Sequence, residues 1–515
     1  MRTLRKRTAD ALTERLMAEA RGGSWPSVWD RFEGQVPNCA FGTMGLCCRA
    51  CSQGPCRIDP FGQVETTTCG RTRTALVAAE FCRQVAEGAA SQLAHAWPAA
   101  GDGTPDAGPV LQAMEVAREG DRSAEDTLMA AVRAALAGAS ALALVPADGA
   151  TVRTKAGPAA LGRDEANVLL VGRFSAAAAG AFAGGRGAGV NVAGACGAEG
   201  EGRFPVAGDY GSQEVLVASG VVDAVVAGEA CVAPGLEKAA QAAGVPFFRL
   251  GAGNPSESAV FGGATFGSAR FGSPGDVEQV ARAAEGHFRR AAGRSTRPWP
   301  DGPEAVVGLG GVARDLLTAV AGGAVTASGL RGVAWLGGCN NTRATHRGPI
   351  LDQARALLAA DVLVLASGCA GAALACAGLL DPDRRDHPVG RGLAEFVGRA
   401  QKTAGLALPP VWHLGSCWSD GHTLALLADL ARAGVPVLAS FPEASRPAAW
   451  ATAVASAARG IPTYLGPVLP LDGTREARDL FGRVLRETGG KALAGPGQVR
   501  RPEQVAAVLW DGEGA

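Results

Sequence analysis

The chain has no excess of charge of either sign, because 49 basic and 49 acidic residues balance over 515 positions. We therefore expect neither a nucleic-acid partner nor a membrane-surface partner that binds through net charge. The first residues, MRTLRKRTADALTERLMAEA, are basic but continue as an amphipathic helix without the apolar core of a secretory signal. These features predict a protein of the cytoplasm.

Long apolar runs are also scarce. One segment, residues 362–380, lacks any charged side chain and approaches the length of a membrane-spanning helix. Ser367, Gly368 and Cys369 interrupt it, and alanine and glycine dominate the remainder. A buried strand, turn and helix therefore fit this segment better than a membrane span.

Aromatic residues make up only 5% of the chain, whereas glycine occurs 73 times and apolar residues make up 47%. Such small, apolar side chains suit close-packed helices and buried parallel strands. The length allows two to four domains, each with its own core. The thirteen cysteines of this chain indicate reduced thiols and metal binding rather than disulfides.

Six of these cysteines crowd into residues 39–69, with glycines between them. Short, uneven spacing of this kind is typical of a loop wrapped around an iron–sulfur cluster. A zinc site would need two separated pairs of ligands, and six cysteines overfill it. Disulfides are not expected without secretion. The six are Cys39, Cys47, Cys48, Cys51, Cys56 and Cys69.

The first part of the chain has helical periodicity. Residues 2–21, 71–97 and 104–137 predict helices, the last with a polar break at 119–123, and residues 27–33 are expected to bridge into the cysteine loop. From residue 167 the pattern changes to short valine-rich runs that end at glycine or cysteine and alternate with helical stretches. That alternation predicts a parallel sheet in an α/β fold.

We therefore expect an N-terminal helical cluster-binding domain followed by two Rossmann-like α/β domains. The expected boundaries are residues 1–160, 161–298 and 299–515, with a proline-rich linker at 295–304.

Five cysteines of the second half each follow a predicted strand closely. The carboxyl ends of parallel strands share one edge of a sheet, so these thiols can converge on one crevice. The alternative is a set of unrelated buried cysteines. Cys376, inside a predicted helix, and Cys82, alone on the long helix, fit that alternative better. The five are Cys196, Cys231, Cys339, Cys369 and Cys417.

Two groups of motifs resemble the anaerobic nickel–iron–sulfur carbon monoxide dehydrogenases of the hybrid-cluster protein superfamily. The first is CAFGTMGLCCRACSQGPCRI, and the second comprises VNVAGACGAEGEG, GVVDAVVAGEACVAPGL, WLGGCNNTRA, VLVLASGCAGAALACAGLL and PPVWHLGSCWSD. The resemblance covers nearly the whole chain. It implies an oxygen-avoiding homodimer that exchanges electrons with a ferredoxin-like carrier and acts on a small-molecule substrate.

The resemblance also implies which cysteines bind metal. In the N-terminal group, Cys48, Cys51, Cys56 and Cys69 would hold an internal [4Fe–4S] cluster. Cys39 and Cys47 would hold half of a second cluster, which the two subunits share. The active-site metal cluster would be held by Cys231, Cys339, Cys369 and Cys417, with Cys196 as a further candidate.

The chain departs from the family pattern at four positions. Arg173 replaces the histidine that binds an outlying iron, and arginine has no lone pair to offer a metal. Gly197 stands at the second position of a Cys-Cys pair, which leaves Cys196 undecided as a ligand. Ala448 replaces a lysine that stabilises CO₂, and Gln92 replaces a histidine of a proton relay.

Six histidines leave few substitutes for the missing groups. Arg173, His95 and His413 are the candidate catalytic residues, and His422 is a further histidine near Cys417. A structural hydrogen-bonding role fits each histidine equally well. The chain is also shorter than members of the family, through an expected loss of N-terminal helices that leaves the crevice open or covered by a partner.

Three functions follow as hypotheses. The family implies interconversion of CO and CO₂ at a variant centre, either a plain [4Fe–4S] cluster or a mixed-metal cluster with nickel. The missing groups equally favour reduction of another small molecule, as in hybrid-cluster proteins that reduce nitrogen oxides. Arg173 would suit an anionic substrate there, because a guanidinium binds oxyanions through paired hydrogen bonds. The third hypothesis is a non-catalytic electron-transfer or sensor protein.

Overall fold

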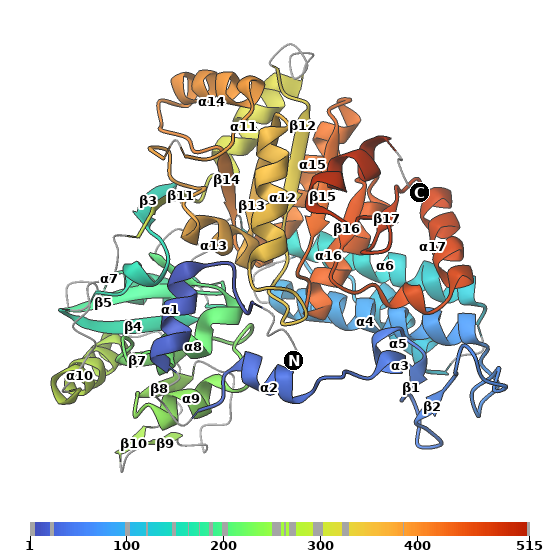
Figure 1. Ribbon diagram of the computed structural model, residues 1–515, viewed down its shortest axis with the longest axis horizontal. Coiled ribbons are helices and arrows are strands. Elements are labelled where there is room, and N and C mark those ends of the chain that lie inside the picture. Colours follow the sequence, from blue (N-terminus) through green and yellow to red (C-terminus); the bar gives the residue numbers. More distant parts are fainter. Residues whose placement is uncertain are drawn as a thin grey trace.

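The computed structural model describes most of the chain (Figure 1). The described residues are 6–511, except for 21–24, 98–102, 120–121, 147–150, 163, 175, 185–188, 198–203, 250–258, 262–263, 267–273, 292–301, 322–328 and 385.

The chain begins with small elements that lead into long helices. The short ones are α1 (Ala11–Ala20), α2 (Val28–Gly34), α3 (Ala40–Thr43), β1 (Cys47–Cys48) and β2 (Cys56–Arg57). The long ones are α4 (Arg73–Ala96), α5 (Gly108–Glu119) and α6 (Ala124–Leu142). The helices predicted at 71–97 and 104–137 are confirmed, including the break after residue 119.

One prediction near the N-terminus is wrong, and the form of a second segment was not specified by the sequence. The helix expected over residues 2–21 begins only at Ala11, because Asp10 accepts a hydrogen bond from the backbone N–H of Thr13 as a helix cap does. Thr8 instead pairs with His346 in an isolated parallel bridge. The segment expected to bridge at 27–33 is largely helix α2, which Ser27 caps through the backbone N–H of Asp30.

The first parallel sheet has the strand order β6-β5-β4-β7-β8. Helices α1, α8 (Gln213–Ala218) and α9 (Leu236–Ala242) pack on one face, and α7 (Ala176–Gly184) and α10 (Pro274–Arg290) pack on the other. A separate hairpin joins β9 (Ala259–Phe261) and β10 (Ala264–Phe266). The five strands are β4 (Ala166–Val171), β5 (Val190–Ala195), β6 (Val206–Gly208), β7 (Ala224–Ala227) and β8 (Phe247–Arg249).

The second parallel sheet has the order β14-β13-β12-β15-β16-β17. Its strands are β12 (Gly332–Leu336), β13 (Val362–Ser367), β14 (Val411–Gly415), β15 (Val437–Phe441), β16 (Thr463–Leu465) and β17 (Leu493–Ala494). The helices between them are α11 (Gly310–Ala321), α12 (Gly348–Ala359), α13 (Gly368–Cys376), α14 (Arg391–Ala404), α15 (Asp420–Arg432), α16 (Pro447–Ala458) and α17 (Arg475–Glu487).

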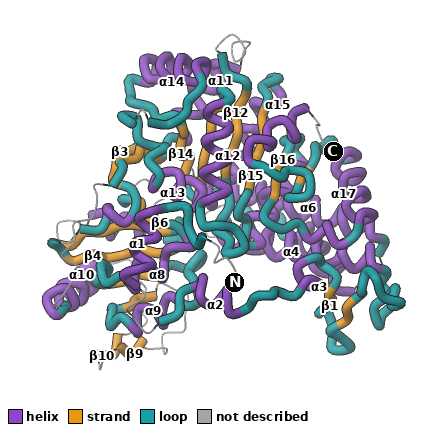
Figure 2. The backbone as a smooth tube through the Cα atoms, in the orientation of Figure 1, coloured by secondary structure: helices purple, strands orange, loops and turns teal. Residues whose placement is uncertain are grey.

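Both sheets are doubly wound, since in each the chain starts at a central strand and moves outward in both directions (Figure 2). The predicted α/β class, helical first and then Rossmann-like, is therefore confirmed. The uncharged run at 362–380 forms β13 and α13 inside the second sheet's core. Among the described residues, no helix combines the length and apolarity required to cross a membrane.

One pairing was not predicted. Strand β3 (Val152–Lys155) pairs antiparallel with β11 (Glu304–Val307), although the two lie far apart in the sequence. Most of the linker expected at 295–304 lies outside the described residues, and its last residue opens β11. The three domain boundaries remain predictions.

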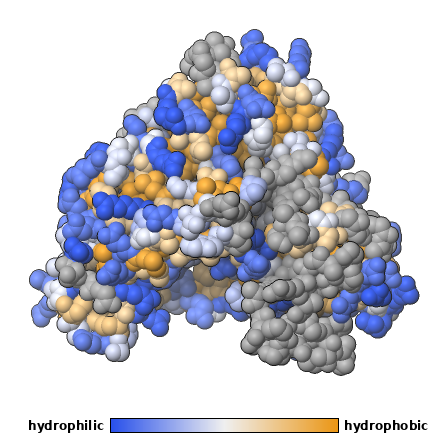
Figure 3. Space-filling model, turned by 180° about the vertical axis from the view of Figure 1, so that it is seen from behind, coloured by the Kyte–Doolittle hydropathy of each residue, from blue (hydrophilic) through white to orange (hydrophobic). Residues whose placement is uncertain are grey.

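The long helices and the second sheet share one hydrophobic core, to which α4, α6 and α16 contribute. Helices α4 and α16 approach closely: a Cβ added at Gly88 would lie 2.0 Å from the carbonyl oxygen of Pro447. On the face shown in Figure 3, hydrophilic side chains are spread out rather than gathered in one patch.

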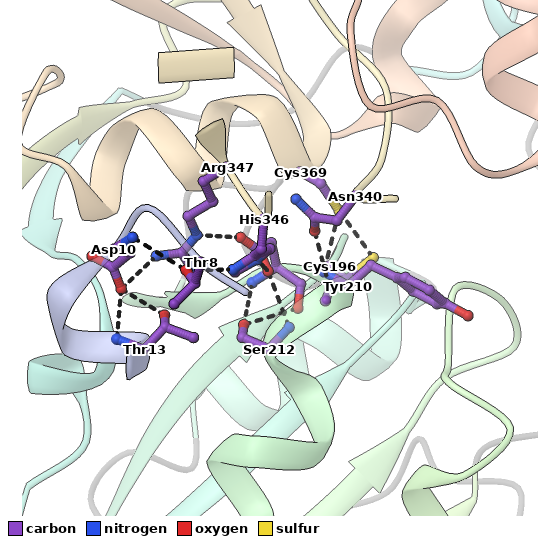
Figure 4. A network of polar contacts seen from close by, with 12 residues as sticks. Thr8, Asp10, Thr13, Cys196, Tyr210, Ser212, Asn340, His346, Arg347 and Cys369 are labelled. Atoms are coloured by element: carbon purple, nitrogen blue, oxygen red, sulfur yellow. Dashed lines mark hydrogen bonds and ion pairs between the residues drawn. The ribbon is translucent and has the colours of Figure 1, made fainter. Parts of the chain in front are cut away.

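A buried polar network joins the N-terminal segment to both sheets (Figure 4). Asp209, just after β6, accepts hydrogen bonds from His346 Nε2 at 2.9 Å and Arg347 Nε at 2.6 Å. Arg347 also pairs with Asp10 at 3.1 Å, and Thr8 contacts His346 Nδ1 at 3.0 Å. Burial alone would raise the pKa of Asp209, but the charges of Arg347 and His346 hold it well below its usual range.

The substitution Arg347→Met should destabilise the protein strongly, because it removes the guanidinium that pairs with the fully buried Asp209 carboxylate. Loss of one partner of such a pair costs about 3–5 kcal/mol. We expect an anaerobic thermal scan to show a melting temperature lower by roughly 5 °C or more. Arg282→Met, in the exposed pair with Glu278, is the matched control and should change little. Equal melting temperatures for the two variants would contradict a role for the network in stability.

Candidate metal centre

Five thiols lie where the carboxyl edges of the two sheets face each other. Two of the thiols follow β5 and β7, the strands that flank the central strand β4 of the first sheet. The other three follow β12, β13 and β14, which are neighbouring strands of the second sheet. We call this group, in that order, the five-thiol centre: Cys196, Cys231, Cys339, Cys369 and Cys417.

The thiols contact one another across the two sheets. Cys196 Sγ lies 3.4 Å from Cys369 Sγ, and the Cys231 thiol hydrogen-bonds with those of Cys196 and Cys417. Cys339 is close enough to Cys369 and Cys231 for their charges to raise its pKa. The expected convergence of the five cysteines is therefore present, and it includes Cys196.

The backbone around the centre takes unusual conformations. Cys196 and Cys231 have φ values of 53° and 60°, in the left-handed region that residues with a side chain seldom adopt. Gly338 and Gly368, next to Cys339 and Cys369, also have positive φ. Strain of this kind persists where the surrounding structure holds it, and it concentrates at functional sites.

Burial and mutual contact decide the protonation of these thiols. Burial raises the pKa of Cys339. The pKa of Cys231 is lowered, first by hydrogen bonds from Cys196 and Cys417, with Arg446 and Arg173 contributing positive charge. The hydrogen bonds with Cys231, together with burial, raise the pKa of Cys196 and Cys417.

The donor set fits an iron–sulfur or mixed-metal cluster, because soft thiolates are the ligands that such clusters take. Within the described part of the chain, no three His, Cys, Asp or Glu side chains are arranged around a single metal ion. A cuboidal cluster takes one thiolate per iron, so its ligands need not point at one position.

The cysteine loop lies apart, beside the start of α4 (Figure 1). Cys48 and Cys56 face each other across the β1–β2 pair, and burial, followed by the charge of Cys39, raises the pKa of Cys47. Thr67 bonds to Cys69 at 3.3 Å and lowers its pKa. These proximities agree with the predicted grouping, whose binding of clusters remains a prediction.

Two other cysteines have different surroundings. Cys82 is fully buried on α4 and donates to the carbonyl oxygen of Ala113 at 3.5 Å. Burial raises the pKa of both Cys82 and Cys376 to about 12, so both remain thiols. This agrees with the expectation that neither belongs to a metal site.

Arg173 and His95 meet beside the five-thiol centre. Arg173 follows β4, where its backbone N–H donates to Ala230 O and its carbonyl accepts from Glu229 N, each at 3.1 Å. Its side chain donates to His95 Nδ1 and pairs with Glu229. The His95 ring packs on Trp418 with centroids 4.5 Å apart. Burial, with the charge of Arg173, lowers the pKa of His95 to about 3.

The other two histidines have structural contacts. His413 is buried in β14, where its backbone accepts from Leu309 N at 2.7 Å, and burial lowers its pKa to about 4. His422 bonds to the carbonyl oxygen of Val145 at 2.6 Å. Neither contact places the ring against a thiol of the centre.

Gln92 and Ala448, the positions at which the resemblance implied a relay histidine and a lysine, contact each other. Gln92 Nε2 donates to Ala448 O at 3.2 Å and to Thr452 Oγ1 at 2.8 Å. Both residues lie in the close α4–α16 contact, and Gln92 is buried. The Gln92 side chain is thus engaged in the contact between α4 and α16.

Two residues near the centre were missed by sequence analysis. The Tyr210 backbone N–H donates to Cys369 Sγ at 3.4 Å, and the guanidinium of Arg446 lies 4.9 Å from the Tyr210 ring centroid. The only sequence signal for Arg446 was its place two residues before Ala448 in FPEASRPAAW.

Helix α2 covers a cavity of about 70 Å³ that adjoins the centre. Trp29 and Arg31 line it from α2, and Asn340, next to Cys339, lines it from the second sheet. Arg31 also pairs with the buried Glu214 at 2.6 Å. On this side, the chain's own N-terminal segment covers the crevice.

The chain is similar to carbon monoxide dehydrogenases over most of its length. Residues 46–126 and 174–494 match the model of the Prismane/CO dehydrogenase family. Carbon monoxide dehydrogenase 2 of Carboxydothermus hydrogenoformans is 26% identical, with 94% of each chain covered. Carbon monoxide dehydrogenase of Rhodospirillum rubrum is 27% identical, with 92% of this chain and 94% of that protein covered.

Solved structures show the same fold. Carbon monoxide dehydrogenase IV from Carboxydothermus hydrogenoformans superposes with a TM-score of 0.84 at 22% identity, covering 98% of both chains. The alignment with the first relative spans 612 positions, more than the 515 residues of this chain. Residues of that relative that have no counterpart in this chain therefore lie inside the aligned region.

Glu443 should give the protein's stability a distinct pH dependence. Burial raises its pKa from 4.5 to about 8, although the backbone N–H of Arg347 partly offsets this. Between roughly pH 4.5 and 8 the unfolded chain ionises this group and the folded chain does not, so stability falls as pH rises. Glu443→Gln should therefore reduce the loss of melting temperature between pH 5.5 and 8. Glu278→Gln, which changes an exposed side chain, should show the pH dependence of the wild type. If the melting temperature of Glu443→Gln fell with pH as steeply as that of the wild type, the raised pKa of Glu443 would be contradicted.

Proposed function

Because the chain belongs to the Prismane/CO dehydrogenase family, we propose that it is an iron–sulfur oxidoreductase whose five-thiol centre acts on a small molecule other than CO. The observation that carries the proposal is the meeting of five cysteines from two sheets at one place, with unusual backbone at two of them. Soft sulfur donors from five strand ends that meet at one place are the ligand set that iron–sulfur clusters take.

The cysteines have separate tasks in this proposal. Those of the five-thiol centre would hold the active-site cluster. Cys48, Cys51, Cys56 and Cys69 would hold an internal [4Fe–4S] cluster, and Cys39 and Cys47 would share another with a partner subunit. Bound clusters supply one-electron transfer and, at the centre, open metal coordination for a substrate. A ferredoxin-like carrier is the proposed electron donor or acceptor.

The substitutions around the centre support a substrate other than CO. Arg173 offers no lone pair to an outlying iron and is instead bonded to His95 and Glu229. Gln92 and Ala448 are occupied in helix packing. His95 stays neutral at pH 7, so it orients and donates a hydrogen bond rather than carrying a proton.

CO and CO₂ interconversion is the second candidate, and Arg446 favours it. Its charge acts on Cys231 and Cys339, so a cation stands near the centre although Ala448 replaces the lysine. A cation there would stabilise negative charge that develops on a bound substrate.

Metal analysis with a viologen-coupled assay distinguishes these functions. We expect anaerobically purified protein to contain iron without stoichiometric nickel, to show no CO-dependent dye reduction, and to reoxidise reduced viologen with a small oxidised substrate. Nickel near one per chain with CO-dependent dye reduction would instead support the second candidate. Iron without turnover of any acceptor would favour an electron-transfer or sensor protein.

Loss of a ligand tests the centre itself. Cys231→Ser should lower the iron content per chain, because it removes the thiol that contacts two others in the centre. Cys376→Ala, which changes a partly buried cysteine outside the centre, is the control and should retain wild-type iron. Unchanged iron in Cys231→Ser would contradict the assignment of Cys231 as a ligand.

The shared cluster predicts a link between iron content and assembly. Replacing Cys39 and Cys47 together by serine should remove one cluster per dimer and weaken association, measured by anaerobic light scattering and iron analysis. Cys82→Ala provides the control on α4. A doubly substituted protein that stays dimeric with full iron would rule out the shared cluster.

A further inference from the structure

Three N–H groups beside the five-thiol centre have no hydrogen-bond acceptor among the described residues. They are the Nε2 group of His95, the Nε group of Arg173 and the Nε1 group of Trp418. All three atoms are buried, and Trp418 as a whole is only 6% exposed. Buried donors without acceptors each cost about 1–3 kcal/mol, so three together require an explanation.

The three side chains form one group. Arg173 donates to His95 Nδ1, and its guanidinium carbon lies 5.9 Å from the Trp418 ring centroid. The rings of His95 and Trp418 have their centroids 4.5 Å apart. The unpaired donors therefore belong to one small region at the junction of α4, the β4 turn and the turn after β14.

The hydrogen bond from Arg173 determines the tautomer of His95. A guanidinium can only donate, so His95 Nδ1 must accept and must lack a proton. The ring is neutral at pH 7, since its pKa is lowered to about 3 by burial and by Arg173. The single ring proton therefore lies on Nε2, which makes that atom a donor.

This group adjoins the five-thiol centre. Trp418 directly follows Cys417, and a Cβ added at Gly197 would lie 3.6 Å from Trp418 Nε1. Gly197 in turn follows Cys196. Arg173 lies in the turn bonded to the segment just before Cys231, and its charge helps to lower the pKa of that thiol.

The chemistry of the group indicates the missing ligand. Donors without acceptors, together with one fixed positive charge, suit an anion with several acceptor atoms. Arg173 Nη2 pairs with the more exposed Glu229, and Arg173 Nη1 donates to His95. Only the buried Nε group of the guanidinium therefore remains to donate to a ligand. The remaining donors come from three neighbouring side chains, which suits an anion of a few atoms.

We propose that Arg173, Trp418 and His95 form a binding subsite for a small oxyanion beside the five-thiol centre. The claim that this anion is the substrate rests on the proposed function, and it makes the substrate a small oxyanion. A nitrogen oxyanion and a one-carbon carboxylate share the required chemistry, and separate titrations distinguish them.

Calorimetric titration of the anaerobic holoprotein at low chloride tests the subsite, with nitrite, formate and bicarbonate as separate probes. We expect saturable binding of at least one anion. Arg173→Gln and Trp418→Phe should each weaken it about tenfold or more, since each removes one donor from a charged acceptor. Arg173→Lys should bind with intermediate affinity, and Glu229→Gln should bind more tightly because a competing carboxylate is removed.

The chain offers matched controls. Arg249 pairs with Glu237 and lies on the Phe247 ring, as Arg173 does with Glu229 and Trp418, so Arg249→Gln should leave the affinity unchanged. The Trp510 indole already donates to Val437 O at 2.8 Å, so Trp510→Phe controls for loss of an indole. Each variant is compared with wild type for melting temperature and iron content.

The subsite and the proposed function can fail separately. Absence of saturable binding for all three anions, or wild-type affinity in both Arg173→Gln and Trp418→Phe, overturns the subsite whatever the iron content. Binding that the variants weaken in a protein without iron would retain the anion site and reject the oxidoreductase.

Discussion

The buried ion pair between Asp209 and Arg347 fixes how the two sheets face each other. Asp209 directly follows β6, an edge strand of the first sheet. Arg347 stands at the start of α12, the helix that follows β12 of the second sheet. The five-thiol centre draws two cysteines from one sheet and three from the other, so the spacing of its thiols depends on this contact. Gly211 N also donates to Asn340 Oδ1 at 3.0 Å, which joins the segments next to Tyr210 and Cys339.

The position of the centre could be predicted from sequence because it depends on local pattern. Valine-rich runs that end in glycine and cysteine define strand ends, and parallel strands place those ends at one edge. The contacts of Arg446, Trp418 and Tyr210 could not be predicted, because each depends on a segment distant in sequence. The start of α1 shows the same limit, since Thr8 pairs with a residue 338 positions away. Binding of metal by any cysteine remains a prediction.

The two positions at which sequence analysis expected acid–base groups lie close together in the structure. Gln92 and Ala448 lie where α4 and α16 touch, and Gly88 lets the two backbones approach there. Gln92 reaches the backbone carbonyl oxygen of Ala448 rather than its side chain. The two positions at which sequence analysis expected acid–base groups therefore lie in one helix–helix contact.

The N-terminal segment has a consequence for how the protein is made. Thr8 and Asp10 can be held only after Asp209, His346 and Arg347 have been synthesised, and Cys417 is added to the chain later still. During translation the first residues must therefore wait for most of the chain before they find their partners. Helix α2 is less restricted, because Arg31 pairs with Glu214 and Trp29 packs in the core of the first sheet, which is synthesised earlier.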